Sequence, residues 1–141
     1  MKYFKPHIVL LTFLLGYQFT LAQSPRIDEA RVNFIAQKLQ LSPSESKAFW
    51  PLYNEYIDKM KAIRKERKKL FNGYNYSSGP ADAEQFVSKH IQLDNAEIQI
   101  RNEYIQKFKQ LIGPVKTAYL LKAEEEFRLE LIKILKSEKQ D

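Results

Sequence analysis

Apolar residues recur at every third or fourth position along most of this chain, which is the pattern of amphipathic helices. After residue 22 no stretch alternates in the way a strand does, so the fold class is predicted to be all-α. We expect four helices, over residues 26–40, 43–71, 82–112 and 114–136.

The second helix has the best-marked start. Ser42 can cap it, Pro43 suits a first helical position because its missing N–H would have no partner there, and Glu45 completes a capping box. Pro51 follows inside the same pattern. It predicts either a kink near Ala48 or a separate first turn ahead of the main helix, and we expect the kink.

The remaining helix boundaries are marked by glycine and proline. Residues 72–81 read as the one sustained loop, where Gly73 ends a helix and Asp82 caps the next. Gly113-Pro114 breaks the chain again. These breaks separate the third and fourth helices from their neighbours.

Two of the predicted helices have about 30 residues, and at 1.5 Å per residue each would be about 45 Å long. Short connections force neighbouring helices into antiparallel hairpins. We therefore expect an elongated or cradle-like arrangement. Its uncovered apolar surface predicts a homodimer, because a second copy can supply the missing layer.

The N-terminus has the pattern of a secretory signal peptide. Lys2 and Lys5 precede an apolar run over residues 8–21, and residues 20–22 suit a signal peptidase. The run is short for a membrane span, which needs about 20 apolar residues. We predict cleavage after Ala22 and a single exported domain over residues 23–141, with an uncleaved anchoring helix as the alternative.

The charge and the cysteine content of the chain limit the kinds of partner and covalent modification that we expect. Removing Lys2 and Lys5 from 23 basic residues leaves 21 against 17 acidic ones, a net charge of about +4. Outside the cytoplasm this mild excess favours envelope proteins, anionic lipid or acidic glycans over nucleic acid. The chain has no cysteine, so neither a disulfide nor a lipidated cysteine is available.

Residues for metal binding or catalysis are sparse. After the signal peptide only His90 and Met60 remain as soft ligands, on different helices, and we interpret both as packing residues. The carboxylates of residues 124–126 lie at pairing distance from Lys122 and Arg128, as on a solvated helix face. We predict no enzyme activity, no cofactor and no metal site.

A run of cations in the second helix stands out. Arg64, Lys65, Arg67 and Lys68 have no acidic residue three or four positions away in their own helix. One interpretation is that they complement the negative end of the helix dipole. The other is that they bind a partner, because unpaired charge speeds encounter.

Apolar residues accompany these cations and would complete a surface for binding clients or partners. They are Tyr56, Ile63 and Phe71. Trp50, at helical spacing from Tyr53, is interpreted as a packing anchor between helices, with a contact at a dimer or client surface as the alternative.

Two runs, residues 41–56 (LSPSESKAFWPLYNEY) and 116–135 (KTAYLLKAEEEFRLELIKIL), resemble the Spy/CpxP-like periplasmic proteins, in the form described as a sensor of ECF-type sigma factor. That family carries a repeated Leu-Thr-x-x-Gln motif at helix starts. Here the first copy is a variant at residues 41–45, and a degenerate second copy falls at residues 112–116. The residues that carry the first motif and its continuation are Leu41, Ser42, Pro43, Glu45, Trp50, Pro51 and Tyr53.

The resemblance implies long helices in a curved, cradle-like dimer that works in the periplasm without nucleotide. It implies one of three roles: chaperone, inhibitor of a stress sensor, or metal sensor. Because metal ligands are sparse, we expect a chaperone-like stress protein that binds partly unfolded envelope proteins. The alternative is a regulatory protein that binds a membrane stress sensor or anti-sigma factor.

Overall fold

The structure is a computed structural model, and it describes residues 23–137. Those residues form helices and no strand, which confirms the all-α prediction. There are three helices: α1 (Gln23–Leu39), α2 (Pro43–Gly73) and α3 (Pro80–Ser137). The predicted signal peptide, residues 1–22, lies outside the described residues.

The described chain divides into two compact units. The central unit comprises residues 39–122, and the described part of the terminal unit comprises residues 23–38 and 123–137. Each unit has its own set of packed side chains and is described by itself.

The capping box predicted for α2 is present. The Ser42 hydroxyl accepts a hydrogen bond from the Glu45 N–H at 3.2 Å, and the Glu45 carboxylate accepts one from the Ser42 N–H at 2.7 Å. Two backbone donors that the helix itself cannot satisfy are thereby paired. α2 then runs unbroken with Pro51 inside it, so no separate first turn forms.

The connection between α2 and α3 is shorter than predicted. α2 continues to Gly73, and α3 begins at Pro80, two residues before the predicted cap at Asp82. The Ala83 N–H donates to the Gly79 carbonyl at 3.0 Å, which closes a first helical turn that already includes Asp82. The prediction of Asp82 as the cap was wrong, because proline at the first helical position had already started the helix.

The break predicted at Gly113-Pro114 is confined to one residue. Gly113 has φ 77° and ψ 166°, outside the helical region, while the helix on either side belongs to the single element α3. The Thr117 hydroxyl donates to the Gly113 carbonyl at 2.8 Å, across the first turn after the break. The described residues therefore form three helices by element order where four were predicted, but α3 consists of two helical segments that meet at a kink at Gly113.

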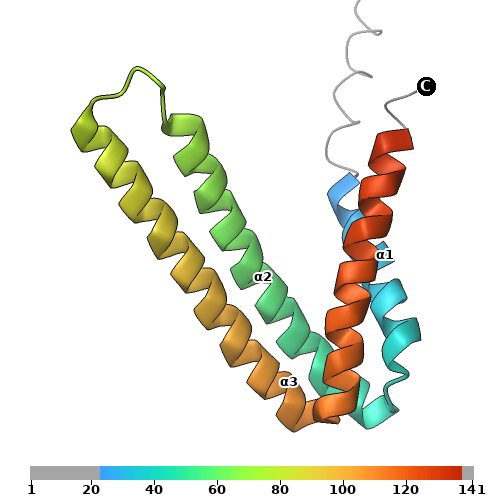
Figure 1. The fold of residues 1–141 in the computed structure, drawn as a ribbon. Coiled ribbons are helices and arrows are strands. Elements are labelled where there is room, and N and C mark those ends of the chain that lie inside the picture. Colours follow the sequence, from blue (N-terminus) through green and yellow to red (C-terminus); the bar gives the residue numbers. More distant parts are fainter. Residues whose placement is uncertain (1–22, 138–141) are drawn as a thin grey trace, which may run out of the picture. The chain divides into compact units, whose positions relative to one another are not determined.

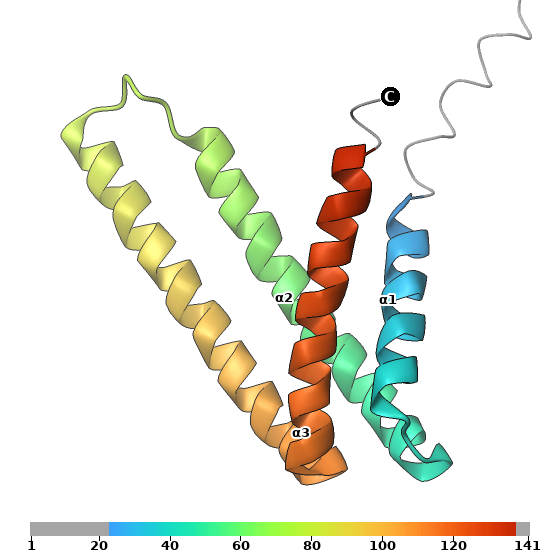
Figure 2. The same cartoon turned by 45° about the vertical axis from the view of Figure 1, so that its right-hand side comes forward.

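In the central unit, α2 and the first part of α3 (residues 80–112) lie side by side and run in opposite directions (Figures 1 and 2). Their interface is built from aromatic rings. Phe49 and Tyr56 of α2 lie 5.5 Å and 5.8 Å, centroid to centroid, from Phe108 of α3, and Tyr56 lies 5.5 Å from Tyr104. All four side chains are buried, so this cluster is the core of the central unit.

A salt bridge joins the start of α2 to the residues after Gly113. Lys116 Nζ lies 2.6 Å from the Glu45 carboxylate and 3.5 Å from the Gln40 carbonyl oxygen. Gln40 is the one non-glycine residue with positive φ, 45°, among the described residues. Lys116 therefore contacts both the turn before α2 and the capping box of α2. Lys116 and Glu45 of that box are 71 residues apart in the sequence.

We predict a pH-dependent contribution from this salt bridge. Hydrogen bonds from the Lys116 ammonium and then from the Ser42 N–H lower the pKa of Glu45 from its ordinary value of 4.5 to about 2. Because the folded pKa is the lower one, the stabilisation is complete above pH 4.5 and is lost as the pH falls from about 4.5 to about 2. The difference in thermal unfolding midpoint between wild type and Glu45→Gln should shrink over that range.

Glu84→Gln serves as the matched control, because Glu84 is exposed on α3 and takes part in no salt bridge within the described residues. Its midpoint should follow that of the wild type from pH 7 to pH 2. A Glu45→Gln difference that stays constant down to pH 2 would contradict the prediction.

The terminal unit pairs α1 with residues 123–137 of α3, which run in the opposite direction. Phe34 and Phe127 pack at 5.8 Å between ring centroids, and the Arg31 guanidinium lies over the Phe127 ring at 5.5 Å. Lys38 forms a salt bridge with Glu126 at 3.2 Å. The predicted solvated face holds for Glu125, which pairs with Arg128 at 2.6 Å.

Candidate functional site

Three of the four predicted partner-binding cations are accessible. Arg64, Lys65 and Lys68 are exposed on α2, and none of them takes part in a salt bridge within the described residues. A hydrogen bond from Lys69 and, to a smaller extent, the nearby charge of Lys65 lower the pKa of the Glu66 carboxyl, whereas Arg64 and Lys68 have no such acidic neighbour within the described residues. Other cations of the same segment are paired, as Lys59 is with Glu55 and Lys69 is with Glu66.

Arg67 differs from the other three, and its predicted availability was wrong. Its guanidinium lies 2.8 Å from a carboxylate oxygen of Asp94 and 2.8 Å from one of Glu97, both on α3. The side chain is about a quarter exposed. Arg67 therefore joins the two helices, and its partners could not be seen from the spacing within α2.

The predicted role of Tyr56 in partner binding was also wrong. Tyr56 is 5% exposed and packs against Tyr104 and Phe108, so it belongs to the core. Ile63 is half-buried. Tyr56 lies four positions before the buried Met60, so both residues are on the same side of α2, and that side faces α3.

Two other aromatic side chains are partly accessible. Phe71 is 50% exposed and contacts the rings of Phe86 and His90 at 5.2 Å and 5.5 Å between centroids. Trp50 is half-buried against Phe49 and Tyr53 of its own helix, at 5.0 Å and 5.8 Å. Phe71 thus remains available to a partner, whereas Trp50 mainly packs.

Helical spacing arranges the accessible residues of α2 in one row. Arg64, Lys68 and Phe71 stand at positions i, i+4 and i+7, which lie on the same face of a helix. We call these three residues the basic row. Lys65 points elsewhere, because it is one position from Arg64 and so about 100° away around the helix.

A second row lies on α3. Val87, Ile91 and Ile98 stand at positions i, i+4 and i+11 and are 50%, 53% and 55% exposed. We call these three residues the apolar row. Asp94 falls at position i+7 of the same series, where its charge is paired with Arg67. All three residues lie in the helix predicted over residues 82–112, but the sequence alone could not show that they are exposed.

The two rows border the same junction between α2 and α3. Phe71 of the basic row contacts His90, which lies between Val87 and Ile91 in the sequence, and Arg67 bridges to Asp94 between Ile91 and Ile98. One face of the α2 and α3 pair therefore carries unpaired positive charge along one helix and uncovered aliphatic side chains along the other.

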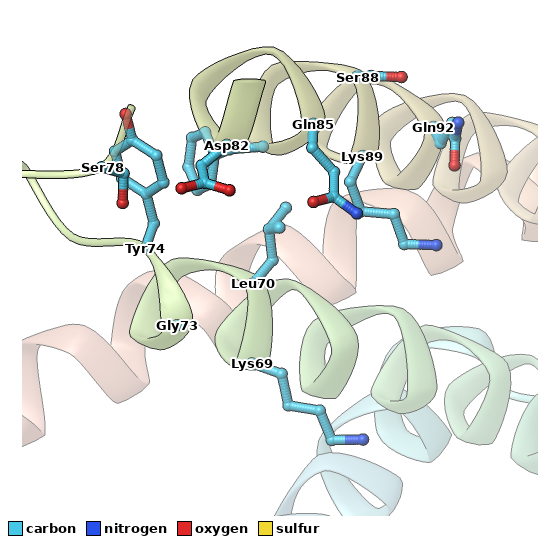
Figure 3. Close-up of a pocket in the computed structure, with 11 residues that line it drawn as sticks. Lys69, Leu70, Gly73, Tyr74, Ser78, Asp82, Gln85, Ser88, Lys89 and Gln92 are labelled. Carbon is cyan, nitrogen blue, oxygen red and sulfur yellow. The ribbon is translucent and has the colours of Figure 1, made fainter. Parts of the chain in front are cut away.

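A hollow of about 750 Å³ lies between the end of α2 and the start of α3 (Figure 3). Leu70 points across it from α2 toward α3, and Lys69 and Lys89 reach out from the two helices. Phe86 is covered by Tyr74 at 4.4 Å. The lining mixes cations, a carboxylate, amides and rings, and Lys69 is paired with Glu66, so the hollow has no single chemical character that selects a ligand.

Residues 23–137 contain neither a cluster of metal ligands nor a helix suited to cross a membrane. No group of three or more potential ligands there could hold a metal ion. Met60 is buried, and His90 is half-buried, with its Nε2 atom 3.6 Å from Asp94. None of the helices in this part of the chain combines the length and the apolar character that a bilayer crossing requires.

Comparisons of the chain with models of protein families, with curated protein sequences and with solved structures gave no match. The resemblance to Spy/CpxP-like proteins therefore stays a prediction.

Proposed function

We propose that this protein is a periplasmic, ATP-independent chaperone-like protein of the envelope stress response that binds partly unfolded proteins. The observation that supports it best is the pairing of the two rows on one face of the central unit. Positive charge without a partner speeds the encounter with acidic clients. Exposed aliphatic side chains then provide contacts that do not depend on one exact partner sequence.

The proposal includes the antiparallel hairpins and the homodimer that the family resemblance implies. Apolar side chains near the end of α3 support the dimer, because Leu129, Ile132 and Leu135 are 46%, 37% and 48% exposed. A second copy that covered them would remove apolar area from water. Sedimentation equilibrium would test this part, and a monomer at all concentrations would contradict it.

Light scattering of a chemically denatured test protein measures the proposed activity. The wild-type protein should suppress aggregation at stoichiometric amounts. Arg64→Ser/Lys68→Ser should slow capture by up to about tenfold at low ionic strength and reduce its salt dependence, because the attraction that steers the encounter is weakened. Arg67 is left unchanged, since its loss would leave Asp94 and Glu97 without their partner.

Lys47→Ser/Lys109→Ser is the matched control. It removes the same charge from exposed positions of α2 and α3 that lie outside both rows. The control should capture clients as the wild type does. A wild-type protein that fails to suppress aggregation would remove the chaperone proposal, and equal slowing in the two double variants would place the site elsewhere.

The alternative is a regulatory protein that binds one membrane stress sensor or anti-sigma factor. The regular spacing of the apolar row favours a partner of defined shape. Affinity capture from an envelope extract separates the two functions. A single dominant partner would favour regulation, whereas a broad set that changes with stress would favour the chaperone.

A further inference from the structure

The two rows also limit the conformation of the segment that they can bind. Residues 23–137 contain no strand, so the face presents only the outer surfaces of helices. Within a helix, the backbone N–H and C=O groups away from its ends are paired with one another. No sheet edge is available on this part of the chain to which a bound segment could add a strand.

An extended segment would bind such a face with an unfavourable free-energy contribution from its backbone. Each of its residues carries a backbone donor and acceptor, and those that the two rows cover would lose water without finding a hydrogen-bond partner on the helix surfaces. Buried backbone groups that lack hydrogen bonds are strongly disfavoured. A helical segment avoids this penalty, because its own backbone bonds are already made.

The repeat of the apolar row also matches a helix. Val87 and Ile91 are about 6 Å apart along the axis of α3, and Ile91 and Ile98 about 10 Å apart, at 1.5 Å per residue. A second helix that packs along α3 repeats its side chains at the same intervals. Side chains on one face of a strand repeat about every 6.8 Å. Over the length of the apolar row, the nearest strand side chain would therefore lie about 3 Å from the position that Ile98 occupies.

Charge indicates what lies beside the apolar stripe of the bound helix. Arg64 and Lys68 border the junction and have no ion pair within the described residues, while Asp94, the acidic residue within the apolar series, is engaged by Arg67. Acidic side chains on the bound helix would meet Arg64 and Lys68, and basic ones would be repelled.

We propose that this face binds its partner as an amphipathic α-helix with acidic residues along one flank, the apolar stripe of that helix lying against Val87, Ile91 and Ile98. This inference rests on the proposed function and names the kind of segment that the same surface takes. It applies equally to a helix that forms within an unfolding client and to a helix of a single regulatory partner.

Three labelled peptides of about 18 residues test the inference by fluorescence anisotropy with the full chain. The first has apolar residues at i, i+4, i+7 and i+11 and glutamates along one flank. The second has the same composition, permuted so that apolar and acidic residues alternate. The third keeps the helical pattern with lysine in place of glutamate. The first peptide should bind at least tenfold more tightly than either of the others.

Surface variants locate the binding. Ile91→Ser/Ile98→Ser should weaken binding of the first peptide at least tenfold. Arg64→Ser/Lys68→Ser should weaken it and flatten its salt dependence. Val115→Ser is the control, because Val115 is 61% exposed in the central unit but lies outside both rows. It should bind like the wild type.

Two results would overturn the inference: permuted and helical peptides that bind within twofold of each other, or binding that Ile91→Ser/Ile98→Ser leaves unchanged. The aggregation assay keeps this failure apart from that of the proposed function. If the permuted peptide binds equally well while Ile91→Ser/Ile98→Ser still reduces suppression, the chaperone proposal stands and the helical preference falls. If the wild type suppresses no aggregation, the chaperone proposal falls whichever peptide binds.

Discussion

Replacing Phe108 by alanine should destabilise the protein by about 3–5 kcal/mol, the range for truncating a large buried ring. Phe108 is 1% exposed and has four aromatic neighbours. Its ring lies 5.5 Å from Phe49, 6.3 Å from Tyr53, 5.8 Å from Tyr56 and 6.2 Å from Tyr104, between centroids. No other ring can fill the space, because these neighbours are themselves held by α2 and α3.

The expected loss is a large part of the total, since domains of this size are stable by only about 5–15 kcal/mol. Urea unfolding followed by far-ultraviolet circular dichroism measures it. Ile98→Ala is the matched control on the same helix, and at 55% exposure it should change stability by no more than about 0.5 kcal/mol. If Phe108→Ala lowered the free energy of unfolding by less than about 1 kcal/mol, the aromatic cluster would not be a tightly packed core.

Replacing Gly113 by alanine should lower the free energy of unfolding by about 1–3 kcal/mol, for a reason that involves no side-chain contact. A Cβ atom added at Gly113 meets nothing within 4 Å, so space is not the obstacle. The obstacle is the backbone, because φ 77° with ψ 166° is a conformation that only glycine adopts without strain. The variant must either accept that strain or change the path of the chain between Ile112 and Pro114.

Gly73→Ala provides the comparison. Gly73 is the last residue of α2, it has no positive φ, and an added Cβ there also meets nothing within 4 Å. Alanine should raise the free energy of unfolding by up to about 1 kcal/mol, because it reduces the freedom of the unfolded chain. If both glycine variants were equally stable in urea unfolding, the strain assigned to Gly113 would be refuted.

Features that depend on neighbours in the sequence could be predicted. The capping box needs only Ser42 and Glu45, three residues apart, and the break at Gly113 needs only the glycine and the proline after it. Met60 and His90 were interpreted from the sequence as packing residues, and the structure has Met60 buried and His90 half-buried.

Features that depend on another helix could not be predicted. Arg67 has no acidic residue within reach in α2, yet it pairs with two carboxylates of α3. Glu45 was expected only to cap α2, and the structure adds Lys116 as a second partner. Spacing identifies neighbours along one helix, whereas these contacts are set by how two helices align.

For the same reason, part of the candidate site could be predicted from the sequence and part could not. The apolar positions of α3 cover too much of its circumference for the sequence to decide which of them face α2. Phe108 is buried and Ile98 is exposed, although both belong to that sector. The cations Arg64, Lys65 and Lys68 were recognised because their lack of a partner within α2 is visible in the sequence.

The division of the chain into two units bears on the order in which they can form. The central unit is one continuous stretch, residues 39–122, so all its contacts become available once that stretch has been synthesised. The terminal unit combines the first described helix with residues 123–137, which emerge after the whole central unit. α1 (17 residues) therefore has to wait for its partner segment, because most of the stability of a helix in a protein comes from packing of its apolar face. During that interval Phe34 and Ile35 have no companion from residues 123–137, so the nascent protein itself briefly resembles the unfolded chains that it is proposed to bind.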